Sequence, residues 1–246
     1  MIHTYYMDVT QFEDKDLFQE KLESLSPYRQ QKISQLKQEA DRRRSLGAGL
    51  VLDHALRIYG NGLRERDMEY VLGEWGKPSL REYPEIHFSL SHSGAYAMCS
   101  IGGNPVGNDV ERVRTGRLKV AERFFTAQEL AFLYRGQDES VRRSRPNNSG
   151  YGSRNACEEE EEIVQRMFRI WTMKESFLKV TGRGMTLSLK DFSVIVEKEG
   201  DKVLVEHRFD AAAYHMKEYA DIPGYRAAVC CLAGDEMAEN MKRVLF

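Results

Sequence analysis

The stretch IVQRMFRIWTMKESFLKVTG, residues 163–182, places a strong constraint on how this chain folds. Its apolar residues recur at helical spacing, at Ile170, Met173, Phe177 and Val180. This spacing predicts a helix with one apolar flank, which another element must cover. Gly182 is expected to end the helix, because glycine readily adopts the left-handed conformation of a C-terminal cap. The fold therefore needs a layer against which this helix can pack.

The stretch PVGNDVERV, residues 105–113, alternates like a strand and carries two acids, Asp109 and Glu111. Successive side chains of a strand point to opposite faces, so the two acids share one face, with their Cα atoms roughly 6.5–7 Å apart. Like charges this close repel unless water, an arginine or a cation lies between them. Two interpretations are open: a solvated edge strand neutralised by Arg112 and Arg114, or a cation site.

Helical and strand patterns are mixed along the rest of the chain, which favours an α+β fold. Strands are expected within residues 2–9, 70–80, 85–103 (a hairpin turning at Ser93-Gly94), 187–200 and 225–234. Helices are expected within 11–38, with a new start at Ser26-Pro27, within 40–60 and from about Ala127, where Thr126 and Glu129 have capping-box spacing. Residues 136–157 are polar and lack an apolar period, so we expect a flexible surface loop.

Composition excludes several classes of protein. Among 246 residues, 36 are Lys or Arg and 38 are Asp or Glu, so a protein dedicated to nucleic acid is not expected. No run approaches the ~18 apolar residues of a membrane span, and residues 1–16 lack the apolar core of a secretory leader. Four cysteines without CxxC spacing predict free thiols in a reducing compartment. We therefore expect a cytoplasmic protein with neither nucleic acid nor a membrane as partner.

Glu175 and Lys179 are four residues apart and share one face of the predicted helix. An ordinary surface ion pair is the simpler interpretation. If the helix packs against the strand that carries Asp109 and Glu111, however, Glu175 would bring a third carboxylate to that strand. Mg²⁺ prefers a few carboxylates together with waters and substrate phosphates. The three acids are therefore a candidate Mg²⁺ site.

Several other residues would suit an anionic ligand. Ser91 and His92 lie next to the predicted hairpin turn, and Lys77 lies in the turn GKP. A basic cluster spans two predicted helices, at Arg29, Lys32, Arg42, Arg43 and Arg44. Arginine forks bind phosphate oxygens in pairs, so this cluster is a candidate phosphate clamp. A solvated basic face and a structural histidine are the alternatives.

Taken together and in this order, GKP, FSLSHSGAY, VGNDVE and WTMKESFLKVTGRG resemble the motifs of the 4′-phosphopantetheinyl transferases. The resemblance is to the long single-chain type, the surfactin-synthetase-activating type, and runs from about residue 26 to 184. Its most specific part, W-x-x-K-E-x-x-x-K, is matched at Trp171, Lys174, Glu175 and Lys179. Three positions depart from the family: Ser89 replaces a usual asparagine, Asn108 replaces a usual aliphatic residue, and Met185 replaces a usual leucine.

The resemblance implies transfer of the 4′-phosphopantetheine arm of coenzyme A to a serine of an apo acyl or peptidyl carrier protein, with release of adenosine 3′,5′-bisphosphate. It implies Mg²⁺ bound by Asp109, Glu111 and Glu175, and catalysis by Glu175, Lys179 and Asp109. It places coenzyme A against Arg29, Lys32, Arg43, Lys77, Pro78, Ser91, His92 and Lys179.

The family fold is a pseudo-twofold α+β arrangement of two similar halves, with the active site in the cleft between them. Here we expect residues 1–105 to form the half that contacts the phosphates of coenzyme A. Residues 106–246 would form the half with the Mg²⁺-binding acids and the catalytic helix, and the protein would be a monomer. Two alternatives are a non-catalytic protein that binds coenzyme A or a nucleotide, and another Mg²⁺-dependent nucleotide hydrolase.

Overall fold

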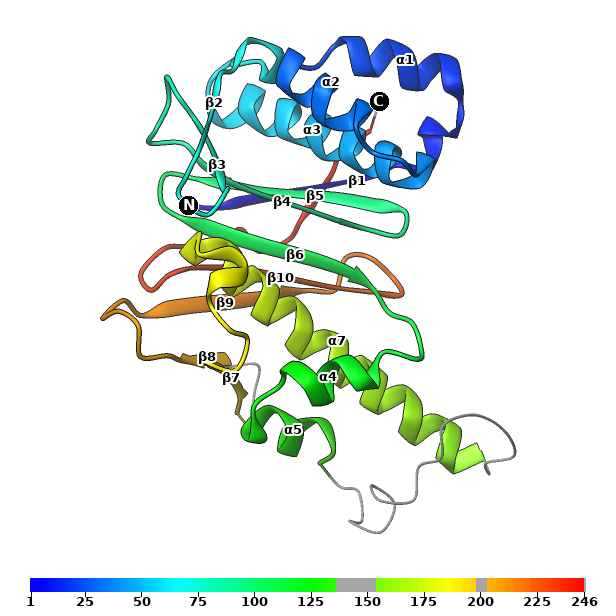
Figure 1. The fold of residues 1–246 in the computed structure, drawn as a ribbon, viewed down its shortest axis with the longest axis vertical. Helices are drawn as coiled ribbons and strands as arrows, with labels where there is room; N and C mark the ends of the chain where they lie inside the picture. Colours follow the sequence, from blue (N-terminus) through cyan, green and yellow to red (C-terminus); the bar gives the residue numbers. More distant parts are fainter. Residues whose placement is uncertain (136–153, 198–202, 246) are drawn as a thin grey trace.

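The computed structural model describes residues 1–135, 154–197 and 203–245 and has an α+β fold (Figure 1). The N-terminal part contains β1 (His3–Asp8), α1 (Lys15–Glu23), α2 (Pro27–Ser34), α3 (Glu39–Tyr59), β2 (Tyr70–Leu72), β3 (Pro78–Leu80), β4 (His87–Ser93) and β5 (Tyr96–Gly102). The C-terminal part contains β6 (Val106–Arg112), α4 (Leu118–Phe124), α5 (Ala127–Leu133), α7 (Arg154–Thr181), β7 (Ser193–Val196), β8 (Val203–Glu206), β9 (Tyr214–Tyr219), β10 (Tyr225–Leu232) and β11 (Lys242–Arg243). Short 3₁₀ turns lie at Thr10–Glu13, Glu65–Asp67 and Gly184–Thr186.

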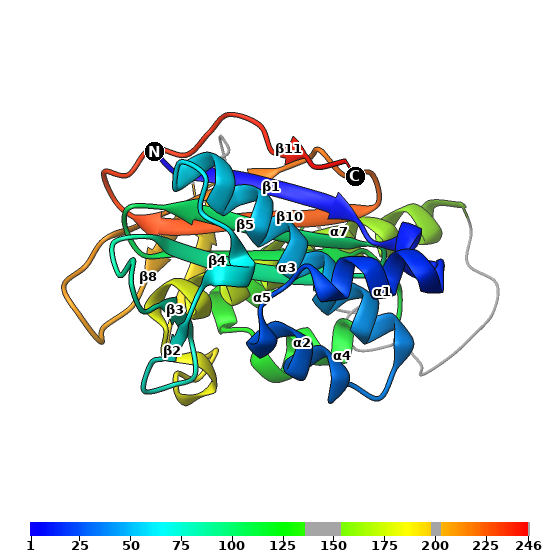
Figure 2. The same cartoon turned by 90° about the horizontal axis from the view of Figure 1, so that it is seen from above.

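Two sheets form the centre of the molecule. One has the strand order β11-β1-β5-β4 and the other the order β6-β10-β9, while β2-β3 and β7-β8 are separate two-stranded ribbons. Helix α3 packs on the first sheet and α7 packs on β6 and β10 of the second, so the helices lie outside the two sheets (Figure 1). Strand β11 pairs in parallel with β1, so the C-terminal strand returns to the first sheet, and both chain ends lie along the same edge (Figure 2).

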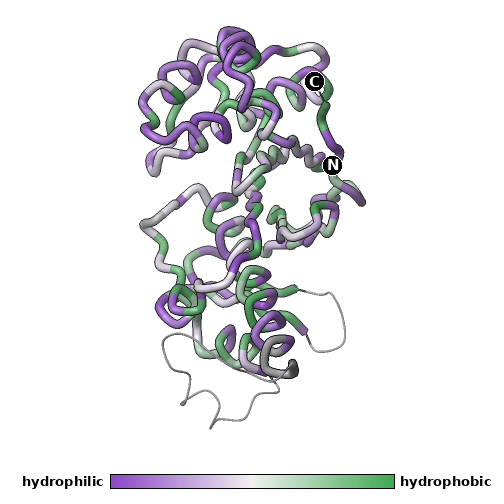
Figure 3. Tube along the Cα trace, turned by 90° about the vertical axis from the view of Figure 1, so that its right-hand side faces the viewer, coloured by the Kyte–Doolittle hydropathy of each residue, from purple (hydrophilic) through white to green (hydrophobic). Residues whose placement is uncertain are grey.

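Three apolar clusters stabilise these layers. The first lies between α3 and its sheet, and the second surrounds α7. The third joins the two sheets, since it contains Met98 of β5 together with Val106 and Val110 of β6. Hydrophilic residues are frequent along the helices of the N-terminal part, which lie at one end of the molecule (Figure 3). Among the described residues, no helix has both the length and the apolar content needed to cross a bilayer.

Most of the predicted helices and strands are confirmed, with their end signals. Ser26 caps α2 through its side chain, Thr126 and Glu129 form both hydrogen bonds of a capping box, and Gly182 takes a φ of +67° just after α7. Strands β3, β8, β9 and β11 were not predicted separately. The turn between β4 and β5 lies one residue later than predicted, because Ser93 still belongs to β4.

The predicted loop 136–157 is wrong at its end. Residues 154–157 form the first turn of α7, and residues 136–153 lie outside the described part of the chain. Alanine, arginine and glutamate dominate the start of this helix, and these are strong helix formers even without an apolar stripe. Periodicity alone therefore placed the helix start too late. The predicted free thiols are confirmed for Cys99, Cys230 and Cys231, which are buried and unpaired.

A buried ion pair fixes α7 against α5 and β7. The ammonium of Lys174, fully buried, donates to Glu129 Oε1 at 2.5 Å and to the carbonyl of Phe192 at 2.9 Å. The same carboxylate accepts the backbone N–H groups of Thr126 and Val194. Burial lowers the pKa of Lys174, and Glu129 opposes this shift. The lysine of the W-x-x-K-E motif is therefore a structural residue, and the next residue, Glu175, points about 100° further around the helix, where it lines the cleft described below.

We expect Lys174→Met to lower the free energy of unfolding by about 3–5 kcal/mol, because Glu129 would be left buried without a countercharge. Urea unfolding followed by circular dichroism measures the loss. The pair of exposed Glu162 and half-buried Arg166 on the same helix provides a control, since Glu162→Gln should cost at most about 0.5 kcal/mol. A loss below about 1 kcal/mol for Lys174→Met would contradict the structural role of the pair.

Candidate functional site

Helix α7 and strand β6 approach each other unusually closely at Gly107. A Cβ atom added at Gly107 would lie 2.0 Å from the carbonyl oxygen of Ser176 and 2.4 Å from the backbone nitrogen of Val180. Both atoms belong to the helix backbone, so no side chain can rotate away to make room. Glycine at this position therefore allows the helix to lie directly on the strand. This contact brings Lys179 next to Asp109.

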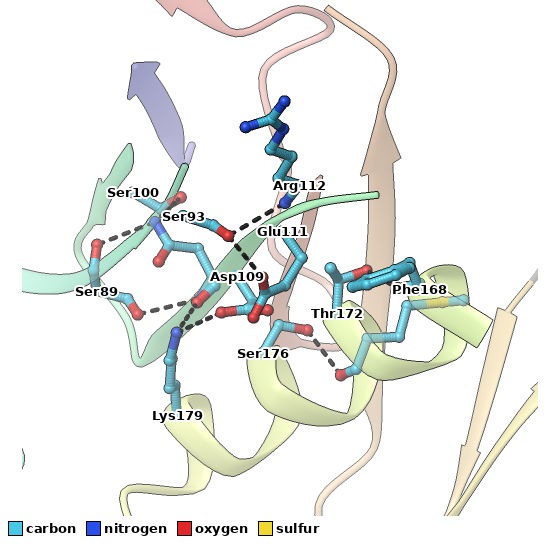
Figure 4. Close-up of polar contacts among 12 residues, drawn as sticks. Ser89, Ser93, Ser100, Asp109, Glu111, Arg112, Phe168, Thr172, Ser176 and Lys179 are labelled. Atoms are coloured by element: carbon cyan, nitrogen blue, oxygen red, sulfur yellow. Dashed lines mark hydrogen bonds and ion pairs between the residues drawn. The ribbon is translucent and has the colours of Figure 1, made fainter. Parts of the chain in front are cut away.

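The ammonium of Lys179 bridges two groups of β6. It donates to the backbone carbonyl of Asn108 at 2.9 Å and to Asp109 Oδ1 at 2.7 Å (Figure 4). The other carboxylate oxygen, Asp109 Oδ2, is buried and has no hydrogen-bond partner. Burial raises the pKa of Asp109 to about 7, with the charges of Glu111 and Glu175 adding to the increase and Lys179 opposing it. Asp109 thus has one satisfied oxygen and one free oxygen in a poorly solvated position.

The two other acids lie close enough to interact with Asp109 through their charge. Glu175 is half-buried, and its pKa is raised by burial and by Glu111, while Lys179 opposes the shift. Glu111 Oε2 accepts a hydrogen bond from Ser93 Oγ at 2.6 Å (Figure 4). Within residues 1–135, 154–197 and 203–245, no three His, Cys, Asp or Glu side chains are already arranged as a metal-ligand set. The expected Mg²⁺ ligands are neighbours, but they are not gathered around one point.

A cleft of about 470 Å³ collects most of the residues that the sequence singled out. It is lined, among others, by Arg29, Lys32, Lys77, Pro78, Ser91, His92, Asp109, Glu175 and Lys179. These residues come from segments up to 150 positions apart in sequence, between Arg29 and Lys179. The cleft therefore combines cations and hydroxyl groups from the N-terminal part with acids and a lysine from the C-terminal part.

Two predicted residues lie outside this cleft. Glu111 lines a neighbouring hollow of about 510 Å³, which shares His92 with the cleft. Arg43 lines a third hollow and has its guanidinium 3.6 Å from Glu13, so the structure does not bring it to the other site residues. Consecutive helical residues point in directions about 100° apart, so three arginines in a row cannot all face one cleft.

Arg44 is the arginine of this run that lies beside the site; it belongs to the predicted basic cluster but is not among the residues that the family resemblance places against coenzyme A. It pairs with Asp41 and lines the hollow that borders His92. The pKa of His92 is lowered by desolvation first and by the charge of Arg44 second. Ala48, one turn after Arg44, lines the main cleft, so the helical face shared by positions 44 and 48 could have identified Arg44.

Arg29 is held in the cleft by a buried carboxylate that no sequence pattern indicated. Glu65 accepts hydrogen bonds from the backbone and hydroxyl of Ser26 and from the hydroxyl of Tyr70, and its Oε1 lies 3.7 Å from Arg29 Nε. The guanidinium also lies over the ring of Tyr70. Desolvation and then Arg29 lower the pKa of Lys32. Arg29 and Lys32 are therefore two interacting cations at this end of the cleft, and such a pair favours an anionic ligand.

Lys77 connects the two parts of the molecule across the cleft. Its ammonium donates to the carbonyls of Lys179 at 2.6 Å and Val106 at 3.0 Å, and burial lowers its pKa to about 8. The carbonyl of Lys179 belongs to the last turn of α7, whose carbonyls lack helical partners. Lys77 therefore caps the end of α7 and leaves one of its three N–H groups for a ligand.

Two of the departures from the family pattern, Ser89 and Asn108, are in contact. The backbone N–H of Asn108 donates to Ser89 Oγ at 3.0 Å, and its side-chain amide donates to the carbonyl of Ser89 at 3.0 Å and to Ser100 Oγ at 3.1 Å. All three residues are buried. The amide nitrogen of the Asn108 side chain is thus satisfied by groups on β4 and β5, whereas its Oδ1 atom is buried without a hydrogen-bond partner.

Taken together, the α+β fold carries a cleft in which several cations lie next to a buried acid–lysine junction, an arrangement suited to a polyanionic ligand. A family model described as "4'-phosphopantetheinyl transferase superfamily" matches residues 105–230. The chain belongs to this superfamily and is similar over most of its length to the long Sfp-type enzymes.

Two relatives and one solved structure illustrate the similarity. The 4′-phosphopantetheinyl transferase Sfp of Bacillus subtilis (strain 168) is 30% identical over 238 residues, which cover 95% of this chain and 95% of the relative. The 4′-phosphopantetheinyl transferase psf-1 of Bacillus pumilus is 31% identical over 193 residues, covering 77% and 71%. The holo-[acyl-carrier-protein] synthase of Thermotoga maritima aligns with a TM-score of 0.36 and 21% identity, covering 52% of this chain and 62% of that chain.

The raised pKa of Asp109 predicts how stability depends on pH. Between its usual value of 3.8 and about 7, the folded protein binds a proton at Asp109 that the unfolded chain has lost. The free energy of unfolding should therefore fall as the pH rises through this window. Above about pH 7, Asp109 should cause no further change with pH. Asp109→Asn cannot lose this proton, so the pH-dependent loss of stability is absent in the variant. Its free energy of unfolding should therefore rise relative to that of the wild type as the pH increases from 4 to 7. Urea unfolding at several pH values measures the difference, and parallel curves for the two proteins would contradict the assignment.

Proposed function

We propose that the cleft binds coenzyme A and that the protein transfers its 4′-phosphopantetheine arm to a serine of an acyl or peptidyl carrier protein. The observation that carries the proposal is the Lys179–Asp109 junction, which lies in one cleft with Arg29, Lys32 and His92. Coenzyme A carries several phosphate groups, and this cleft offers cations and hydroxyl groups from different elements. Membership of the superfamily gives the same activity.

The residues that line the cleft have different proposed tasks in binding coenzyme A. Arg29 and Lys32 would bind the phosphate on the nucleotide, because both line the cleft and the charge of Arg29 lowers the pKa of Lys32, which indicates an excess of positive charge there. Ser91 and His92 would also contact phosphates of coenzyme A, since Ser91 Oγ is buried in the cleft wall without a hydrogen-bond partner. Lys179 and the remaining N–H of Lys77 would face the diphosphate. Pro78 would border the base.

The acids fit a divalent cation by the chemistry of their donor atoms. Asp109, Glu111 and Glu175 offer carboxylate oxygens, and Asp109 Oδ2 is buried without any partner. Mg²⁺ needs only one or two carboxylates when substrate phosphates and waters complete its coordination, so a preformed protein cage is not required. We propose that these three residues hold Mg²⁺ together with the diphosphate. When bound, the ion would neutralise charge on the diphosphate during transfer.

The transfer itself needs a proton acceptor and positive charge. The serine oxygen of the carrier forms a bond to the phosphorus next to the pantetheine, and the bond from that phosphorus to the bridging oxygen breaks. The electron pair leaves with adenosine 3′,5′-bisphosphate, and the serine proton would go to Glu175, which lines the cleft and whose pKa is raised by burial. Lys179 lies where it can stabilise charge on the leaving group.

We further propose that the two parts of the chain are related by a pseudo-twofold arrangement, with residues 1–105 and 106–246 as the halves. Its support is that β4 and β6 lie side by side, each followed in its own sheet by an antiparallel partner, β5 and β10. Each sheet also packs on one long helix, α3 or α7. Strand β11 crosses back to the first half. With the cleft formed within one chain, we propose a monomer, and the buried free thiols support a cytoplasmic location.

Mass spectrometry of a carrier protein tests the proposed function directly. The protein is incubated with coenzyme A, Mg²⁺ and an apo carrier, and the carrier should gain the mass of one phosphopantetheine unless a chelator is added. Asp109→Ala should abolish the gain, because it removes both the free oxygen and the partner of Lys179. Arg43→Ala serves as the matched control and should retain the gain, because Arg43 lies outside the cleft.

Other outcomes of this assay would contradict the proposal. Binding of coenzyme A without a mass gain on several carriers would indicate a non-catalytic binding protein. Release of the nucleotide with no modified carrier would indicate a hydrolase. Full activity of Asp109→Ala at saturating Mg²⁺ would contradict the role of the Asp109 junction.

A further inference from the structure

Strands β4 and β6 meet along the line between the two sheets, but they do not form a backbone ladder. They lie side by side (Figure 1), yet each is the last strand of its own sheet. Two strand edges this close without a ladder must be held together by something other than the usual N–H to carbonyl bonds. The apolar contacts of Met98, Val106 and Val110 account for only one side of this boundary. The other side faces the cleft and is polar.

Serine hydroxyls replace backbone carbonyls along this boundary. Ser89 Oγ accepts the backbone N–H of Asn108 at 3.0 Å, and Ser93 Oγ accepts the backbone N–H of Arg112 at 3.1 Å (Figure 4). Four residues separate the two bonds on each strand, and both strands run in the same direction across them. Ser89, Ser91 and Ser93 alternate in sequence, so their side chains share one face of β4. The pattern S-x-S-x-S therefore presents a row of hydroxyls to the edge of β6.

The two bonds bracket the acidic pair. Ser89 binds residue 108, immediately before Asp109, while Ser93 binds residue 112, immediately after Glu111. Ser93 makes a second bond, donating its hydroxyl hydrogen to Glu111 Oε2 at 2.6 Å. One hydroxyl thus fixes both the backbone next to Glu111 and the direction of its carboxylate. Ser91, between them, is buried and lines the cleft with its hydroxyl unpaired.

We propose that Ser93 is a positioning residue for the acid pair, and that the S-x-S-x-S row holds the edge of β6 so that both carboxylates serve the same cation. Ser93 acts through Glu111 and does not itself contact the substrate. This inference rests on the proposed function, because it assigns Glu111 to the cation that accompanies coenzyme A. It adds a residue that would orient a carboxylate from the opposite strand.

Binding of Mn²⁺ in the presence of coenzyme A, without carrier protein, tests this inference. Electron paramagnetic resonance measures free Mn²⁺, so the readout does not depend on turnover. Ser93→Ala should weaken Mn²⁺ binding at least about tenfold, the range measured when groups that orient metal ligands are removed. In steady-state assays it should lower kcat and leave the KM for coenzyme A within about twofold, because Ser93 lines the neighbouring hollow and not the main cleft.

Two further variants separate positioning from a general structural role. Ser93→Thr keeps the hydroxyl and should retain Mn²⁺ affinity within about threefold of the wild type, since β-branched residues suit strands. Ser193→Ala removes a half-buried hydroxyl on β7 that bonds to Thr126, and it should leave Mn²⁺ affinity unchanged. If Ser93→Ala does not fold, Ser93→Cys replaces it, because the thiol keeps the volume but is a weak hydrogen-bond donor.

Unchanged Mn²⁺ affinity in folded Ser93→Ala or Ser93→Cys would overturn the inference, and so would a threonine variant as impaired as alanine. Failure of the proposed function is a separate result. In that case the wild type itself would not modify a carrier, whatever the Mn²⁺ titrations of the variants show.

Discussion

The close contact between α7 and β6 at Gly107 is the constraint on which the site depends. Strand β6 carries Asp109, whereas α7 carries Lys179 and the candidate base Glu175, about 65 to 70 residues later in the sequence. Only direct backbone contact places Lys179 within 2.7 Å of Asp109 while α7 still packs its apolar flank into the core around Phe177. Because the obstructing atoms at Gly107 are backbone atoms, any side chain there must move the helix.

A second consequence of this contact is electrostatic. Burying Asp109 beneath the helix raises its pKa to about 7, and two further acids add to that shift. Lys179 compensates for only part of the cost of burying this negative charge. Such an arrangement is poorly balanced for stability, and it is well suited to receive additional positive charge from a ligand or ion. By contrast, the buried pair of Lys174 and Glu129 is hydrogen-bonded to its surroundings and supports the packing of α7. Lys174 directly precedes Glu175 on this helix.

Local rules predicted the parts of the fold that depend on local physics. The cap at Ser26, the capping box at Thr126 and the helix end at Gly182 were all visible in the sequence, because each depends on residues within one turn. The alternation around Asp109 likewise gave the correct strand and the shared face of the two acids. Grouping the motifs into one site depended on the family resemblance, since spacing alone could not bring segments so far apart together.

Side-chain directions and long-range partners could not be predicted in this way. Arg43 was chosen from a run of three arginines, and the rotation of α3 brings Arg44 to the site instead. Glu65 gives no pattern in sequence, because its partners Ser26 and Arg29 lie on another helix. The contact between Ser89 and Asn108 joins strands of two different sheets. The sequence therefore did not indicate that these two departures from the family pattern are hydrogen-bonded to each other.

The most direct test of this account is the activity and stability of Gly107→Ala, measured beside Gly103→Ala. At Gly103 an added Cβ meets only the end of the Tyr59 side chain, so this variant should resemble the wild type. At Gly107 the helix must shift, and a displacement near 1 Å at a reacting group costs on the order of a hundredfold in rate. We expect Gly107→Ala to lose about a hundredfold in kcat/KM for carrier modification and to melt at a lower temperature. Wild-type activity and melting temperature in Gly107→Ala would show that the site does not depend on this contact.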